Sequence, residues 1–462
     1  MYLTKDEFLQ KFGILPQEFE EADISWEELL EIADDYERRR PTLEKIRKEF
    51  VAEFLQDKEK EIGLQSYHSR LKDTEHLVEK LVRKRLENYA KYRKMDSTSY
   101  MRYVTDLIVP YYSVIGGWVI KYLVEYVKGG SQTLAEDGYF SAFIADGFST
   151  ETCFLFFALL TLVIIYAGVQ NGVERVSKLM MPILVFLSIV IVVYSVTRPG
   201  ALEGVKYFLI PNIKNFSWMT VVAAMGQMFY SLSIAMGILV TFGSYMKKDV
   251  SIEGSTQNVE IFDTAIAMMA GLMIIPAVFA FSGGEPDTLQ AGPALMFITI
   301  PKVFASMGFG TLVGILFFVL VLCAALTSSI ALTESAVSTF QDELKWGRKK
   351  ATVFIGVIMV VLGSLSSLGY GPLACVKVIG MQFLDFFDFL TNSVMMPIAA
   401  IATCILISRV VGIKKIEDEV LQEGGTFRRK RIFNFMIRYL CPIFAAIILF
   451  SSVANAFGWI SM

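Results

Sequence analysis

The residue with the clearest chemical potential is a lone acid, Asp263, inside a long apolar stretch near 260–281. A carboxylate at membrane depth is costly unless it is paired or binds a cation, so its presence predicts a functional site. Oxygen ligands of this kind suit a hard cation. Asp385 and Asp388, at the start of a later apolar stretch, suit either an external vestibule or the membrane interface.

Two other apolar stretches, 226–237 and 324–329, carry small and polar residues near the middle of a span. Backbone that leaves helical pairing at membrane depth is tolerated only where it lines a cavity, and secondary transporters use such breaks to bind ions and substrates. The same Ser and Thr residues also suit hydrogen bonds between packed helices, and for either stretch alone both interpretations stay open. Together with Asp263 the two stretches favour a binding site.

Membrane-spanning helices must position these residues. Apolar stretches of about 20 residues, the length that crosses a bilayer, occur nine times. Positive charge is richer in alternate loops, including residues 345–350 and 414–431, and the positive-inside rule makes those loops cytoplasmic. With nine spans, the N-terminal segment is then cytoplasmic and the C-terminus external. The expected spans lie near 107–127, 152–170, 179–197, 219–245, 260–281, 309–338, 351–369, 379–409 and 434–458.

Composition divides the chain into a charged segment, 1–106, and an apolar one, 107–462. Of the 89 charged residues, 44 fall in the first segment and 45 in the second. The first is typical of a soluble helical piece and the second of a polytopic membrane protein. A net charge of -3 lacks the basic excess of a nucleic-acid-binding protein. The five cysteines show no CxxC spacing, so neither a zinc site nor a disulfide framework is indicated. The first residues lack the apolar core of a signal peptide.

Three motifs in 109–462 resemble the neurotransmitter:sodium symporter family in its bacterial eleven-helix form. Residues 111–118 are similar to its third helix, 226–237 with 242–245 to its sixth, and 326–331 with Asp342 and Glu343 to its eighth. The resemblance implies an all-α polytopic protein of the bacterial inner (plasma) membrane, built as two inverted five-helix repeats. It also implies sodium-coupled symport of an amino acid or a related small zwitterion.

The resemblance implies a role for individual residues. The Tyr112 hydroxyl would contact the substrate carboxylate, and Asp388 is a candidate external gate. The negative charge of Asp263 would replace a chloride ion, so chloride would not be required. Met236 in place of an aromatic residue is compatible with a sizeable apolar or aromatic substrate. The implied substrate pocket is Tyr112, Tyr230, Ser233, Met236, Ser328 and Leu332; the implied sodium ligands are Ser231 and Asp263 at one site and Ala324, Thr327 and Ser328 at the other.

The chain departs from the family pattern at its start, because only three spans precede the helix that resembles the sixth. The first two helices of the inverted repeats are missing, and 1–106 contains no stretch apolar enough to replace them. In the family those helices give half the sodium ligands and the amides that hold the substrate carboxylate. The rest are too few for a cation that takes about five or six oxygens. Impaired transport is therefore expected.

Residues 63–108 resemble the opening of a RelA/SpoT-type alarmone synthetase domain, through 69–72, 79–84 and 105–107. The resemblance implies that Arg70, Lys72 and Lys80 contact the phosphates of a nucleotide and that Asp106 holds magnesium. It breaks off before the strands that would carry the acceptor pocket, so no enzymatic activity is expected. Two alternatives remain beside the symporter: a membrane-anchored (p)ppGpp synthetase fragment, and a non-functional fusion or misassembly of two genes.

Overall fold

The computed structural model describes residues 97–462, with gaps at 248–249, 284–291, 422–425, 458 and 460–462. The predicted residues Arg70, Lys72 and Lys80 therefore lie outside the described residues. Within them the chain is helical, and the one β-type pairing is an isolated bridge between Val378 and Met381. Among the described residues, eight helices are long and apolar enough to cross a membrane. The expectation of an all-α polytopic membrane protein is confirmed.

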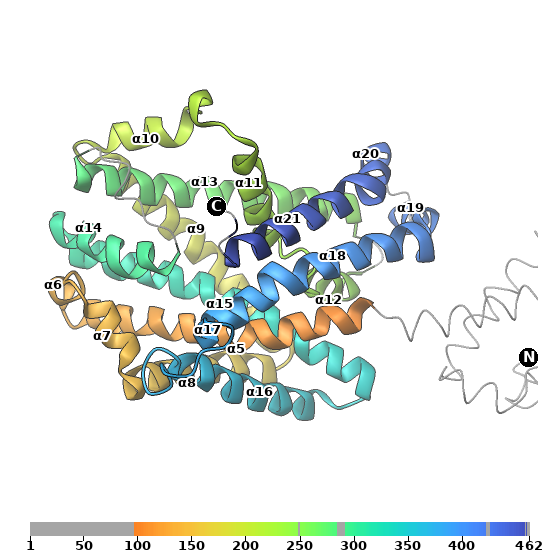
Figure 1. Cartoon of the computed structure of the whole chain (residues 1–462), viewed down its shortest axis with the longest axis horizontal. Coiled ribbons are helices and arrows are strands. Elements are labelled where there is room, and N and C mark those ends of the chain that lie inside the picture. Colours follow the sequence, from red (N-terminus) through yellow and green to blue (C-terminus); the bar gives the residue numbers. More distant parts are fainter. Residues whose placement is uncertain (1–96, 248–249, 284–291, 422–425, 458, 460–462) are drawn as a thin grey trace, which may run out of the picture. The chain divides into compact units, whose positions relative to one another are not determined.

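The eight membrane-spanning segments account for all the expected spans except the one near 219–245 (Figure 1). They are α5 (Ser97–Val127, with the span at Val104–Val127), α8 (Gly147–Tyr166), η1 and α9 (Val169–Glu174, Arg175–Val196), α13 (Ile252–Ser282), α15 (Gly310–Leu344), α16 (Arg348–Leu368), the run α17, η5, α18 and η6 (Phe383–Asp388, Phe389–Met395, Met396–Ile405, Leu406–Val411), and the run α20, η8 and α21 (Lys430–Phe435, Met436–Leu440, Cys441–Ala456).

Shorter helices connect these spans. They are α6 (Ser131–Leu134), α7 (Tyr139–Ala145), α10 (Ala201–Leu209), η2 (Ile213–Asn215), η4 (Leu295–Thr299), α14 (Ile300–Ser306) and α19 (Ile413–Val420).

The expected span near 219–245 is divided into two helices, α11 (Trp218–Ser231) and α12 (Ile238–Ser244). The residues between them form turns rather than helix. This is the interruption predicted from the polar residues and glycines of 226–237.

The second predicted interruption, at 324–329, is wrong. These residues lie inside α15, which continues unbroken from Gly310 to Leu344. The Thr327 hydroxyl donates hydrogen bonds to the carbonyls of Cys323 and Ala324, at 3.0 Å each. A Thr side chain that bonds back to the preceding turn satisfies its polar group within the helix. The hydroxyl-rich sequence is therefore compatible with a regular span.

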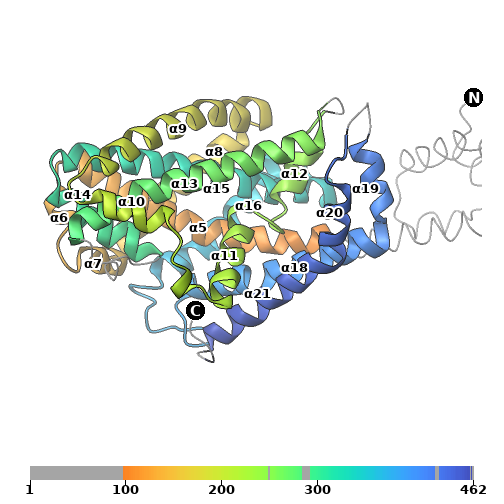
Figure 2. The same cartoon turned by 90° about the horizontal axis from the view of Figure 1, so that it is seen from above.

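Helix α5 forms the centre of the apolar core and packs against α8, α15 and α16 (Figures 1 and 2). Its Tyr122 is fully buried, stacks on Phe318 with ring centroids 5.4 Å apart, and donates a 2.7 Å hydrogen bond to the Phe297 carbonyl. Trp118, one turn earlier, meets Phe297 edge to face at 5.7 Å. These aromatic contacts fix α5, and α5 carries the predicted substrate residue Tyr112.

The α5–α8 contact depends on Gly117. A Cβ atom on Gly117 would lie 2.6 Å from the backbone nitrogen of Phe154, which cannot move without shifting α8. We predict that Gly117→Ala destabilises the fold by about 1–3 kcal/mol through overpacking and lowers the thermal unfolding midpoint of the detergent-purified protein. Gly243→Ala is the matched control, because nothing lies within 4 Å of a Cβ atom there. Equal midpoints for both variants would contradict the close approach.

Candidate functional site

The break between α11 and α12 is held in an unusual backbone conformation. Ser233 and Ala235 have positive φ angles of 54° and 63°, and Gly237 follows at 77°. For residues other than glycine this left-handed region costs about 1–3 kcal/mol and persists only where the surrounding structure imposes it. Such strain is concentrated at ligand-binding sites, which agrees with the predicted function of this segment.

Two predicted ligands of the first sodium site meet at the edge of this break. Ser231, the last residue of α11, donates a 2.7 Å hydrogen bond from its hydroxyl to the Asp263 carboxylate on α13. Asp263 is half-buried and forms no ion pair with a basic side chain in the described part of the chain. The pair therefore presents a hydroxyl oxygen and a negative charge that no basic side chain of the described residues neutralises.

The predicted substrate residues come together from α5, α11 and α15. The side chain of Tyr112 lies close to those of Ser328 and Tyr230. Met236 and Leu332 are 3% and 4% exposed and belong to the same apolar core. Ser233 is half-buried within the break. This set combines four hydroxyl-bearing side chains with an apolar wall, as a site for a small amphipathic molecule requires.

The predicted second sodium set lies on one helix. Ala324, Thr327 and Ser328 are all in α15, and the Thr327 hydroxyl donates to the Ala324 carbonyl. Their oxygens are already engaged within the helix or directed toward Tyr112. These three residues alone would supply part of the coordination shell of a sodium ion.

A hydrogen-bonded cluster surrounds the predicted gate residue Asp388. Asn392 donates from its Nδ2 to Asp388 at 2.6 Å and to the Tyr111 hydroxyl at 3.2 Å. The Tyr111 hydroxyl also lies 3.3 Å from the Thr391 hydroxyl. Sequence reasoning identified Asp388 but missed its partners. The adjacent tyrosines Tyr111 and Tyr112 could have indicated two separate sets of contacts, because adjacent residues on a helix face different neighbours.

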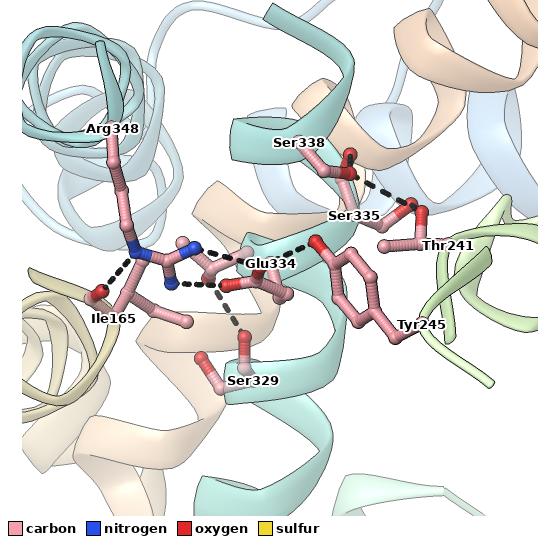
Figure 3. Close-up of polar contacts among 9 residues, drawn as sticks. Ile165, Thr241, Tyr245, Ser329, Glu334, Ser335, Ser338 and Arg348 are labelled. Atoms are coloured by element: carbon pink, nitrogen blue, oxygen red, sulfur yellow. Dashed lines mark hydrogen bonds and ion pairs between the residues drawn. The ribbon is translucent and has the colours of Figure 1, made fainter. Parts of the chain in front are cut away.

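A second cluster, which sequence reasoning missed, joins α12, α15 and α16 (Figure 3). Glu334 is completely buried, and its carboxylate accepts hydrogen bonds from both terminal nitrogens of Arg348, at 2.9 and 2.5 Å. The Tyr245 hydroxyl donates to the same carboxylate at 2.8 Å. Arg348 also donates from Nε to the Ile165 carbonyl at 3.0 Å. Glu334, like Asp263, is an acid inside an expected membrane span. That signal could have identified Glu334 from the sequence.

An apolar groove along the outer face of α11 is separate from these residues. It is lined by Phe216, Thr220, Val221, Ala224, Met225 and Met228. A binding site for a charged or zwitterionic molecule needs several convergent polar groups. Because Thr220 is the single polar side chain in its wall, the groove does not suit such a ligand.

Comparison with known proteins gives consistent matches. Residues 145–458 match the model of the Sodium:neurotransmitter symporter family. The chain is 36% identical over 352 residues to the uncharacterized sodium-dependent transporter YhdH of Bacillus subtilis (strain 168), covering 74% of this chain and 76% of that protein. It is 31% identical over 359 residues to an uncharacterized sodium-dependent transporter of Haemophilus influenzae, covering 76% of each. The crystal structure of MhsT in complex with L-phenylalanine is similar, with a TM-score of 0.66 and 33% identity over 77% of this chain and 80% of that one.

The Glu334–Arg348 pair gives a test of the geometry. We predict that Arg348→Gln destabilises the protein by about 3–5 kcal/mol, because it leaves a buried carboxylate without its cation. The double variant Arg348→Gln/Glu334→Gln should recover most of the loss, since it removes both charges. Lys349→Gln, which removes an adjacent charge, should have little effect. Thermal unfolding in detergent measures all three. If the double variant has the same lowered unfolding midpoint as Arg348→Gln, the unpaired buried charge is not the cause of the destabilisation.

Proposed function

The chain belongs to the sodium:neurotransmitter symporter family, and we propose that it couples sodium to the symport of an amino acid or a related small zwitterion. One observation carries this proposal: the Ser231–Asp263 hydrogen bond lies at the edge of the break between α11 and α12. A carboxylate without a protein cation, beside irregular backbone in a membrane span, has the properties of a cation site.

Sodium is the cation that this chemistry favours. Asp263 supplies one negative charge and Ser231 a hydroxyl oxygen, and hard cations prefer oxygen ligands. When the ion is bound, the Ser231 hydroxyl turns its lone pairs to the cation instead of donating its proton to Asp263. The carboxylate charge balances the sodium charge, so the proposal includes independence from chloride.

The substrate is proposed to bind between α5, the break and α15. Tyr112 would receive the substrate carboxylate, with Tyr230, Ser233 and Ser328 as further polar contacts. Met236 and Leu332 form the apolar wall. A methionine wall adapts to large side chains, and the related MhsT was crystallised with L-phenylalanine. A sizeable apolar or aromatic amino acid is therefore the proposed substrate.

Two further assignments complete the proposal. The positive-inside rule places the segment 1–106 and the loops that hold residues 345–350 and 414–431 in the bacterial cytoplasm, with the C-terminus outside. Asp388, in the cluster with Tyr111 and Asn392, would then lie toward the external side and act as a gate.

Transport by this chain alone is proposed to be impaired. Sodium takes about five or six oxygens, whereas Ser231 and Asp263 supply part of one site and α15 alone supplies part of the other. Residues 1–106 contain no apolar stretch that could supply the other ligands.

The alarmone synthetase alternative gains no support from the described residues. Asp106, its proposed magnesium ligand, lies inside α5, which continues without a break to Tyr112 and beyond. A nucleotidyl transfer site would need this acid on a β-sheet, whereas Asp106 lies on a membrane-spanning helix. The enzyme function is therefore not part of our proposal, and the resemblance of 63–108 stays a sequence-based hypothesis.

Binding measurements test the sodium site. We predict weak, sodium-dependent binding of L-phenylalanine to the purified full chain in a scintillation proximity assay, without a requirement for chloride. Asp263→Asn should abolish the sodium dependence, because it removes the charge that balances the ion. Asp418→Asn, which removes an exposed acid on α19, is the matched control and should bind as the unmodified chain does. Sodium-dependent binding that survives Asp263→Asn would overturn the assignment.

Uptake measurements test the proposed impairment. We predict that an inward sodium gradient does not raise uptake of L-phenylalanine, or of a panel of other amino acids, into proteoliposomes that contain only this chain. The number of cation ligands is insufficient for tight coupling of the ion to the substrate. Proteoliposomes with the B. subtilis relative provide a comparison in the same lipid. Robust sodium-driven accumulation by the purified chain would refute the impairment while supporting the symporter assignment.

A further inference from the structure

The segment formed by α20 and η8 has an outward face of arginines and aromatic residues. Arg431 and Arg438 are exposed and two helical turns apart, and neither forms an ion pair within the described ranges. Phe435 lies between the two arginines in the sequence and Tyr439 follows Arg438, and the two side chains are 56% and 57% exposed. We call this set, with Ile432, the α20 outer face. Arg431, Phe435 and Arg438 recur at intervals of four and three residues, so they share one side of the helix, with Ile432 and Tyr439 beside them.

A neighbouring side of α20 is held by acids from other elements. Lys430 pairs with Glu417 of α19 at 2.7 Å, and Asn434 donates to the same carboxylate at 3.1 Å. Hydrogen bonds from Lys430 and then Asn434 hold the pKa of Glu417 below its ordinary value. Figure 2 shows α19 and α20 side by side at one end of the helical unit.

Helix α13 fixes the start of α20 from a second direction. Glu253 accepts hydrogen bonds from the backbone nitrogens of Arg428 and Arg429, at 3.0 and 3.2 Å. The Arg429 side chain pairs with Glu260 at 2.8 Å. The carboxylates near α20 are thus occupied on its inner side, and the charges of the α20 outer face are left without a protein anion among the described residues.

The length of the span places this face at the membrane surface. The segment Lys430–Ala456 has 27 residues, which at 1.5 Å per residue is about 40 Å, or roughly 10 Å more than a bilayer core. The first six or seven residues therefore extend into the headgroup layer if the C-terminal end reaches the far side. Arg438 then lies close to the edge of the hydrocarbon and Arg431 among the headgroups, while Phe435 and Tyr439 have the position typical of interfacial aromatic residues.

We propose that the α20 outer face binds the phosphate of an anionic phospholipid between Arg431 and Arg438, with Phe435 and Tyr439 against its acyl chains. This site is independent of the proposed transport function. Guanidinium groups recognise phosphate through paired hydrogen bonds, and a cation at the edge of the hydrocarbon is stabilised by an anion there. The face has an excess of positive charge, which a lipid with net negative charge balances and a zwitterionic lipid does not.

Native mass spectrometry of the delipidated full chain tests this site. Phosphatidylglycerol and phosphatidylcholine with identical acyl chains are titrated separately, and we expect a clear preference for phosphatidylglycerol. The variant Arg431→Gln/Arg438→Gln should weaken phosphatidylglycerol binding roughly thirtyfold, the effect of two basic residues at an anionic surface. Arg431→Lys/Arg438→Lys keeps the charge but loses the paired hydrogen bonds, so it should bind phosphatidylglycerol more weakly than the unmodified chain and more tightly than the glutamine variant, which separates lipid binding from misfolding.

The matched control is Lys349→Gln/Lys350→Gln. It removes the same charge from two lysines at the start of α16, whose ammonium groups lie over the rings of Tyr166 and Trp346 at 5.6 and 4.1 Å. This variant should keep the lipid preference. The proposal is overturned if phosphatidylcholine binds the unmodified chain equally well, or if the control variant loses as much affinity as the arginine variant. Competition by inorganic phosphate alone would identify a site for a free anion instead of a lipid and would also overturn it.

Discussion

Inside a bilayer every backbone N–H and C=O group must find a partner within the protein, and this constraint explains where the chain is regular and where it is not. The long spans satisfy it through their own helical hydrogen bonds. The segment between α11 and α12 uses turn hydrogen bonds instead, such as that from the Ile234 N–H to the Phe229 carbonyl at 3.1 Å, and Ser233 and Ala235 adopt left-handed conformations there. Such a costly arrangement persists only where the surrounding structure imposes it, and it is concentrated at ligand-binding sites. The Ser231–Asp263 pair lies at the edge of that segment.

Two acids inside the spans show how the choice of partner decides the role of a buried charge. Glu334 is fully buried, but Arg348 and Tyr245 satisfy its carboxylate, so the cluster closes on itself and ties three helices together. Asp263 has a hydroxyl donor and no cation from the described residues. Its charge therefore remains available to an ion. The same sequence signal, an acid in an apolar stretch, thus yields a structural element in one case and a candidate binding site in the other.

Much of the fold could be predicted from hydropathy, since a span of about 20 apolar residues has few alternatives. The break at 226–237 was predictable because glycines there accompany the polar residues. The break predicted at 324–329 was wrong because Thr and Ser hydroxyls can bond back to the preceding helical turn, as Thr327 does. Sequence does not distinguish that bond from a bond to a ligand. The partner of Glu334 was missed for a different reason: Arg348 lies beyond the end of α15, and only the packing of α16 brings it back.

Helix α5 connects the two ends of the candidate site through adjacent side chains. Tyr111 contacts Thr391 and Asn392 in η5, and Asn392 also donates a hydrogen bond to Asp388 at the end of α17. The Tyr112 side chain, in contrast, lies close to Ser328 on α15. Both tyrosines extend from one turn of a helix whose next turns are fixed by the stacking of Tyr122 on Phe318. A displacement of η5 must then either break the Tyr111 contacts or move α5 with it. Because the aromatic core resists movement of α5, the contacts of Tyr111 are the ones that can change while Tyr112 keeps its place at the proposed substrate pocket.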